Sequence, residues 1–241
     1  MSDITEDRAF AISEVNKVRR VHERGRYDRA TIYAILDAAL VCHIAYIIDG
    51  RPYCTPTGFW REGDHLYWHG SSASRMIRQQ SKGIPICLTV THLDSLVMAR
   101  SGFHHSVNYR CVMAWGNAHA ITDREEKLRL MDNYIERIYP GRSKLIRQPT
   151  AQEFKATTIM GMEIETASGK IRDKHVADEE EDYAGVPAWS ALYPITQVLG
   201  EPQECARQIP GLKRPDEMSD FVPGTRFDVL MTKTYRKAFK D

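Results

Sequence analysis

Seven consecutive residues, 69–75, have the sequence HGSSASR and combine a histidine, a glycine, three serines and an arginine. Serine hydroxyls and an arginine guanidinium hydrogen-bond phosphate oxygens, and glycine permits close backbone approach to a ligand. Residues 66–68 favour a strand, and residues 76–80 favour a helix. A helix start attracts phosphate because its first N–H groups are unpaired, but serine is also a common helix cap. Taken alone, these residues favour capping over phosphate binding.

A second polar stretch, residues 104–110, has the sequence HHSVNYR. Side chains alternate between the two faces of a strand, so Ser106, Asn108 and Arg110 would share one face. Tyr109 would point to the opposite face. We expect the polar face either to line a binding site or to form a barrel rim exposed to water.

Short strands and tight turns must position these stretches. The pattern predicts a helix that begins at Asp28 and then an antiparallel meander. Its strands are expected at 42–48, 53–61 and 65–69, with hairpin turns at 49–52 and 62–64. A helix at 75–81 is expected to follow the meander.

The middle of the chain continues the alternation of strands and helices. Strands are expected at 86–91, 95–99 and 108–121, with a bulge near Gly116, and a last strand is expected at 157–165. Asp123 is expected to cap the clearest helix, and Thr150 a short one. The apolar stripe expected on the clearest helix consists of Leu128, Met131, Ile135 and Ile138.

Composition is that of an ordinary globular protein. A chain of 241 residues, 42% of them hydrophobic, is long enough for one full domain with an appendage. The net charge of +1 argues against a dedicated nucleic-acid binder. No run approaches the roughly 18 apolar residues that span a bilayer, and the charged N-terminus has no apolar signal core. We therefore expect a cytoplasmic protein without nucleic-acid or membrane partners.

The five cysteines are scattered and include no CxxC pair. This spacing favours buried reduced thiols over a zinc site. Changes in residue composition along the chain predict an N-terminal arm (1–26), a barrel domain (27–174) and a loop-rich C-terminal extension (175–241). We expect the extension to pack on the barrel.

Three stretches together resemble one known family. They are LYWHGSSASRM (66–76), ARSGFHHSVNYRCVMAWGNAHAITDREEKLRLM (99–131) and VPAWSALYPI (186–195). They resemble the flavin-nucleotide-binding proteins of the pyridoxamine-phosphate-oxidase-like split-barrel family, which also includes nitroimidazole-resistance proteins. The resemblance covers about residues 20–200. It implies a mainly β fold with flanking helices, namely a six-stranded antiparallel Greek-key split barrel that forms a homodimer with its sites at the interface.

The resemblance also implies a cofactor and residues that contact it. FMN is the expected cofactor, and FAD, deazaflavin and haem are alternatives. In this context phosphate binding by the serine turn becomes favoured over plain capping. The implied cofactor-binding residues are Thr55, Thr57, Gly58, His69, Gly70, Ser71, Ser74, Arg75, Ser106, Asn108, Tyr109 and Arg110. No residue is assigned as catalytic, and no metal site is expected unless His69 ligates a haem.

Alternatives stay open for several of these residues. His69 is expected to contact the cofactor, but a half-buried strand histidine bonded to its neighbours is an equal alternative. Thr55, Thr57 and Gly58 are equally well interpreted as ordinary strand residues. The expected function is an FMN-binding oxidoreductase that acts on a small organic substrate. The alternatives are a non-catalytic flavin carrier or sensor, and a haem-binding split-barrel protein with His69 as ligand.

Overall fold

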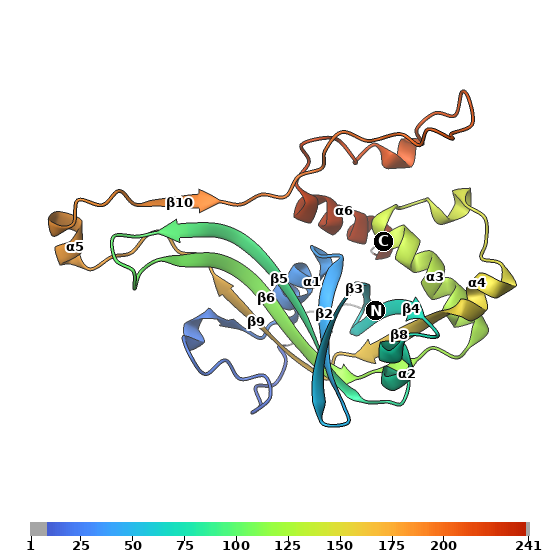
Figure 1. Ribbon diagram of the computed structural model, residues 1–241, viewed down its shortest axis with the longest axis horizontal. Helices are drawn as coiled ribbons and strands as arrows, with labels where there is room; N and C mark the ends of the chain where they lie inside the picture. The colour runs from blue at the N-terminus through green and yellow to red at the C-terminus, as the bar shows by residue number, and fades with distance from the viewer. Residues whose placement is uncertain (1–8, 240–241) are drawn as a thin grey trace, which may run out of the picture. The chain divides into compact units, whose positions relative to one another are not determined.

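The computed structural model describes residues 9–239 as mainly antiparallel β structure with flanking helices (Figure 1). The chain forms two compact units. Unit 1 contains the described residues up to Ile35 together with Thr89–Ala114 and Thr166–Thr196. Unit 2 contains Leu36–Leu88, Trp115–Glu165 and the described residues from Gln197 onward.

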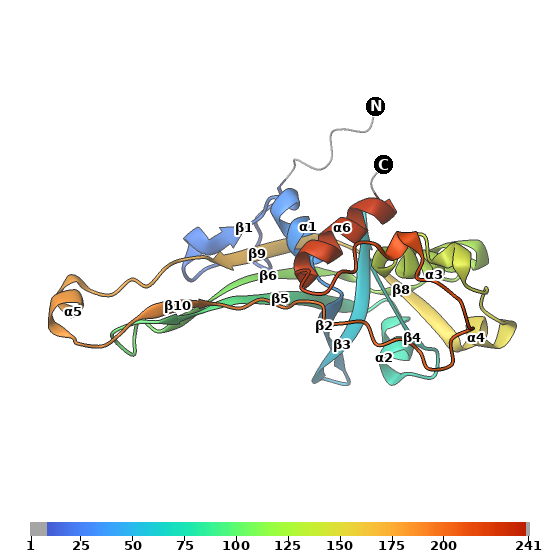
Figure 2. The ribbon, with the colours of Figure 1, turned by 90° about the horizontal axis from the view of Figure 1, so that it is seen from above.

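Unit 1 holds most of two long strands, β5 and β6, with shorter strands paired beside them. Strand β10 runs antiparallel to β5, with Tyr193 opposite Leu96 (Figure 1). Strand β1 runs antiparallel to β9 (Figure 2). Helix α1 begins in this unit, where the Asp28 carboxylate accepts a hydrogen bond from the Thr31 N–H at 2.8 Å. The predicted helix start is therefore confirmed. The elements are η1 (His22–Arg24), β1 (Gly25–Arg26), α1 (Arg29–Asp37), β5 (Pro85–Met98), β6 (Ser106–Asn117), β9 (Thr166–Arg172), α5 (Glu180–Gly185) and β10 (Ala191–Pro194).

Unit 2 contains the predicted meander, in the strand order β2-β3-β4-β8-β7. Asp49 and Gly50 have φ angles of 49° and 74°, so they form the tight turn that the sequence predicts between β2 and β3. Helices α2, α3, α4 and α6 flank these strands. The elements are β2 (Val41–Ile48), β3 (Arg51–Glu62), β4 (His65–Ser71), α2 (Arg75–Gln80), β7 (His119–Ala120), α3 (Arg124–Ile138), η2 (Ser143–Leu145), α4 (Ala151–Ala156), β8 (Thr157–Glu163), η3 (Asp216–Met218) and α6 (Phe227–Phe239).

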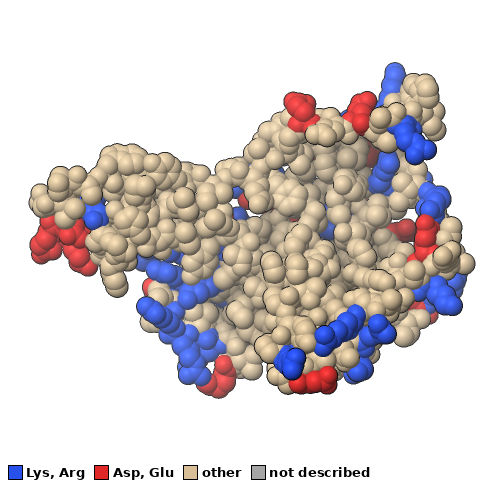
Figure 3. Space-filling view, viewed as in Figure 1, with Lys and Arg blue, Asp and Glu red and all other residues tan. Residues whose placement is uncertain are grey.

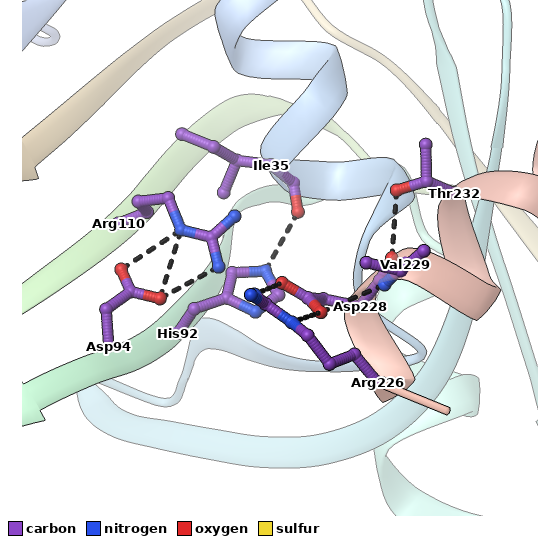
Figure 4. A network of polar contacts seen from close by, with 8 residues as sticks. All are labelled: Ile35, His92, Asp94, Arg110, Arg226, Asp228, Val229 and Thr232. Carbon is purple, nitrogen blue, oxygen red and sulfur yellow. Dashed lines mark hydrogen bonds and ion pairs between the residues drawn. The ribbon is translucent and has the colours of Figure 1, made fainter. Parts of the chain in front are cut away.

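The strand count differs from the prediction. Ten strands are described where six are expected, and their path is open, from β1 at one end to β7 at the other. Strand β5 is one continuous strand rather than two. Its polar residues His92 and Asp94 do not break it, because His92 bonds to the Ile35 carbonyl at 3.0 Å and Asp94 pairs with Arg110 (Figure 4).

The strands around Gly116 also differ from the prediction. Strand β6 ends at Asn117 and β7 is separate, instead of one strand over 108–121. A Cβ at Gly116 would lie 2.2 Å from the carbonyl oxygen of Glu163, so the glycine permits a close backbone approach. Strand β8 is also not the last of the main strands, because β9 follows it directly.

Helix α3 is capped as predicted, but it buries a different face. Asp123 accepts a hydrogen bond from the Glu126 N–H at 2.8 Å, and Thr150 forms a complete capping box on α4. The expected apolar stripe is only half-buried. The buried residues of α3 are instead Leu130, which packs with Trp60, and the charged Arg137. Sequence periodicity predicts an arginine on the exposed side, and only its partners explain its burial.

Two buried arginines lie around Asp37 in unit 2, one bonded to its carboxylate and the other to its backbone carbonyl. The guanidinium of Arg61 forms two hydrogen bonds with the Asp37 carboxylate, of 2.9 and 2.6 Å. Arg137 is 1% exposed and donates to the carbonyl oxygens of Asp37 and Ala39. It also donates to the carbonyl of Met231 on α6, at 2.9 Å. Burial lowers the pKa of Arg137 to about 10, and the Asp37 carboxylate opposes this change, so the arginine stays charged at neutral pH.

We predict that Asp37→Asn lowers the free energy of unfolding by about 3–5 kcal/mol, because it leaves two buried cations without their carboxylate. Urea denaturation measures this value. The matched control is Glu14→Gln, which breaks the exposed pair between Glu14 and Arg19 and should hardly change the unfolding midpoint. Equal effects of the two substitutions would contradict the assignment of Asp37.

Candidate functional site

Eight of the predicted site residues lie in unit 2, on neighbouring elements. Strand β3 carries Thr55, Thr57 and Gly58; strand β4 carries His69, Gly70 and Ser71; and Ser74 and Arg75 begin α2. The other four, Ser106, Asn108, Tyr109 and Arg110, lie on β6 in unit 1.

The serine turn does not cap α2 through Ser74. Ser74 occupies the N-cap position, but its hydroxyl makes no capping hydrogen bond. The Ser71 hydroxyl accepts a 3.3 Å bond from the Ala73 N–H within the turn. Ser72, which was not among the predicted contacts, is fixed through its N–H to the Ala156 carbonyl at 2.9 Å. The turn is thus held by its backbone, and the Ser74 hydroxyl remains available to a ligand.

Gly70 and Arg75 have packing partners within unit 2. A Cβ at Gly70 would lie 2.9 Å from the side chain of Ile77, so the glycine allows α2 to pack closely against β4. The Arg75 guanidinium lies 4.6 Å from the centre of the Tyr53 ring and donates a 2.6 Å hydrogen bond to its hydroxyl. Both contacts fix the position of an otherwise exposed arginine beside the serine turn.

His69 has an unsatisfied buried nitrogen. Its ring is half-buried on β4 and packs edge-on against Tyr134, with 4.6 Å between ring centres. The Nδ1 atom is buried, and no hydrogen-bond partner reaches it among the described residues. Burial lowers the pKa of the imidazole below its usual value of 6.5, so the ring is neutral at pH 7. Buried polar atoms without partners are rare in folded proteins and need an explanation, such as a ligand.

Tyr134 on α3 is a site residue that the sequence did not reveal. A Cβ at Gly58 would lie 2.9 Å from its hydroxyl oxygen, so Gly58 leaves room for the phenol. Its ring also packs on Trp60, at 5.3 Å between centres, and burial raises its pKa. No local pattern could have identified Tyr134, because β4 and α3 are far apart in the chain.

The strand threonines make few polar contacts. Thr55 shares a 3.0 Å hydrogen bond with the Tyr46 hydroxyl, and Thr57 reaches the Gly58 carbonyl only at 3.5 Å. Both residues are half-buried on β3. Neither contact decides between a cofactor contact and an ordinary strand role, so both interpretations of the threonines stay predictions.

Two of the four β6 residues are already engaged by other side chains. Asn108 is 2% exposed, donates to the Lys174 carbonyl at 3.0 Å and accepts a hydrogen bond from Arg172. Arg110 forms hydrogen bonds of 3.0 and 2.8 Å with the Asp94 carboxylate (Figure 4). These contacts give Asn108 and Arg110 structural roles in unit 1. Ser106 and Tyr109 are half-buried on the same strand.

The described residues contain neither a cluster of metal-binding side chains nor a membrane-spanning helix. Between residues 9 and 239, no group of three or more histidine, cysteine or acidic side chains could hold a metal ion. In the same range, no helix is both long and apolar enough to cross a membrane.

Comparison with known proteins identifies the family. A family model named pyridoxamine 5'-phosphate oxidase matches residues 28–171, which is more than half of the chain. The chain belongs to this family. The resemblance read from the sequence is therefore confirmed. No curated protein is a significant match.

Two solved structures are similar to this chain over nearly their full length. The flavocytochrome Anf3 from Azotobacter vinelandii is 39% identical, with a TM-score of 0.82, over 87% of this chain and 97% of the other. An FAD- and haem-binding protein from Mycobacterium smegmatis is 30% identical, with a TM-score of 0.79, over 85% of this chain and 98% of the other. A candidate 5-nitroimidazole antibiotic resistance protein from Bacteroides thetaiotaomicron, 22% identical, shares the fold over 61% and 86% with a TM-score of 0.50.

We predict that the His69 imidazole titrates below pH 6.5 in the protein without cofactor, as followed by NMR. Tyr134→Ala should raise this midpoint because it admits water to the ring, whereas Tyr134→Phe should leave it nearly unchanged. Because the folded pKa is lowered, the unfolded chain binds the proton more readily, and stability falls as the pH drops through 6.5. A midpoint at or above 6.5 in the parent protein would refute a buried neutral His69.

Proposed function

We propose that this member of the family is a flavocytochrome-type oxidoreductase that binds a flavin nucleotide and a haem. The observation that carries the proposal is the 39% identity to a flavocytochrome over almost the whole of both chains. The second relative, which is named for FAD and haem together, supports the same pair of cofactors. FAD therefore joins FMN, the cofactor expected first from the sequence, as a candidate flavin.

The serine turn fits the phosphate of the flavin. The Ser74 hydroxyl makes no cap, and the Ser71 hydroxyl is exposed at the end of β4. Arg75 is held beside them by Tyr53 and adds a charged, two-donor partner. These three side chains would bind and orient the flavin, whose ring supplies the redox chemistry when bound.

His69 fits the requirements of a haem ligand. A ligating imidazole must be neutral, and burial keeps this one neutral at pH 7. Its buried Nδ1 is unpaired, so no internal hydrogen bond has to be broken when the ring takes a partner. The protein's contribution is to hold the ring against Tyr134 and to limit its contact with water.

The absorption spectrum of the purified protein tests the proposal. Flavin bands together with a Soret band are expected. Flavin bands without a Soret band would exclude a bound haem. The flavin-dependent oxidoreductase expected from the sequence would then be the remaining proposal. A colourless protein that takes up neither cofactor on reconstitution would overturn the proposal. The alternative of a non-catalytic flavin carrier predicts that a reduced flavin does not pass electrons to the haem, which stopped-flow spectroscopy measures.

We predict that Arg75→Ala weakens binding of FMN and FAD by about 1.5–3 kcal/mol, because one charge-assisted contact to phosphate is lost. Fluorescence titration measures both affinities. Riboflavin, which has no phosphate, is the control ligand and should bind the variant and the parent nearly equally. A matching loss for riboflavin would mean that Arg75 acts only through its packing on Tyr53.

We predict that His69→Ala abolishes haem binding and keeps flavin binding, as measured by the haem and flavin content of the reconstituted protein. The melting temperature of the apo-protein should change little, because a half-exposed ring buries little apolar surface. His65→Ala is the matched control, since His65 is a half-buried histidine on the same strand that stacks on Tyr67. Full haem content in His69→Ala would exclude His69 as the ligand.

The substrate and the assembly rest on the family resemblance. A small organic substrate and a homodimer with its sites at the interface remain proposals. Sedimentation of the cofactor-loaded protein as a monomer would remove the shared site from the proposal.

A further inference from the structure

One face of α2 and the turn after it carries three cations. Arg75, Arg78 and Gln79 lie on α2, and Lys82 lies in the turn directly after it. These four residues line an open hollow of about 410 Å³. In the space-filling view, lysine and arginine side chains gather over the part of unit 2 where Figure 1 draws α2 (Figure 3).

No carboxylate neutralises these cations among the described residues. Arg75 bonds to the Tyr53 hydroxyl, Arg78 to the Ala73 carbonyl at 2.7 Å, and Lys82 to the Gln79 side chain at 2.7 Å. Two other arginines of unit 2 do meet acids. Arg61 pairs with Asp37, and Arg129 pairs with Glu62 and Glu126. The hollow is therefore a local excess of positive charge.

Such an arrangement suits a ligand with more than one phosphate. Like charges on one helix face repel each other, and a bound polyanion removes this repulsion. Arg78 lies one turn beyond Arg75, which is about 4.5 Å along the helix axis and matches the scale of two linked phosphates. The serine turn and Arg75 suffice for one phosphate, so Arg78 and Lys82 remain for a second.

We propose that Arg78 and Lys82 bind the second phosphate of a flavin dinucleotide, and that α2 thereby selects FAD over FMN. This inference rests on the proposed flavin binding by the serine turn and deepens it. It also extends the site to two residues that are absent from the positions predicted by the sequence. Arg78 on α2 and Lys82 in the turn after it are both exposed to solvent, so their role in folding is small.

The test compares three ligands on matched variants. The double variant Arg78→Gln/Lys82→Gln should bind FAD about tenfold or more weakly than the parent, the scale of one lost charge-assisted contact. Its affinity for FMN and riboflavin should stay within about twofold of the parent's affinity, because neither ligand has a second phosphate. The control is Arg142→Gln/Lys144→Gln, which removes the same two charges from an exposed turn of unit 2.

The outcomes separate the inference from the proposed function. A selective loss of FAD in the α2 variant alone supports the inference. Equal losses for FAD and FMN, or no loss for either, overturn it while flavin binding stands. A parent protein that binds none of the three ligands overturns both. The melting temperature of each variant shows whether it is folded.

Discussion

The buried carboxylate of Asp37 is the interaction on which the arrangement of unit 2 depends. Two arginines, Arg61 from β3 and Arg137 from α3, are removed from water around it, and each would be costly to bury without it. Arg137 extends the cluster to α6 through the Met231 carbonyl. The cluster therefore ties the strand that carries Gly58 to the helix that carries Tyr134, and the surroundings of His69 follow from that connection.

Some polar side chains already have hydrogen-bond partners within the protein and others do not. This difference separates residues with a structural role from candidate ligand-binding residues. Asn108 and Arg110 look like ligand-binding residues in the sequence, but within unit 1 their side chains are already bonded to other protein groups. The His69 Nδ1 atom is buried without a hydrogen-bond partner among the described residues, and the Ser74 hydroxyl makes no cap. A folded chain rarely leaves a buried polar atom unpaired, so the His69 ring indicates where a ligand is needed.

Two glycines of unit 2 shape the site through the side chains next to them. Gly58 and Gly70 appear in the sequence as points where a backbone can approach a cofactor. Their missing side chains instead make room for the Tyr134 hydroxyl and the Ile77 side chain. The site is thus shaped indirectly, because each glycine places a neighbouring side chain that in turn determines what a ligand would meet.

The sequence by itself determined the family, the meander, the turn at Asp49 and Gly50, and the caps at Asp123 and Thr150. These features depend on residues a few positions apart, whose local chemistry selects one conformation. Only the tertiary structure decided that β5 is unbroken, that Arg137 is buried and that Tyr134 lies against His69. Each of these depends on partners far apart in the chain, which local periodicity does not encode.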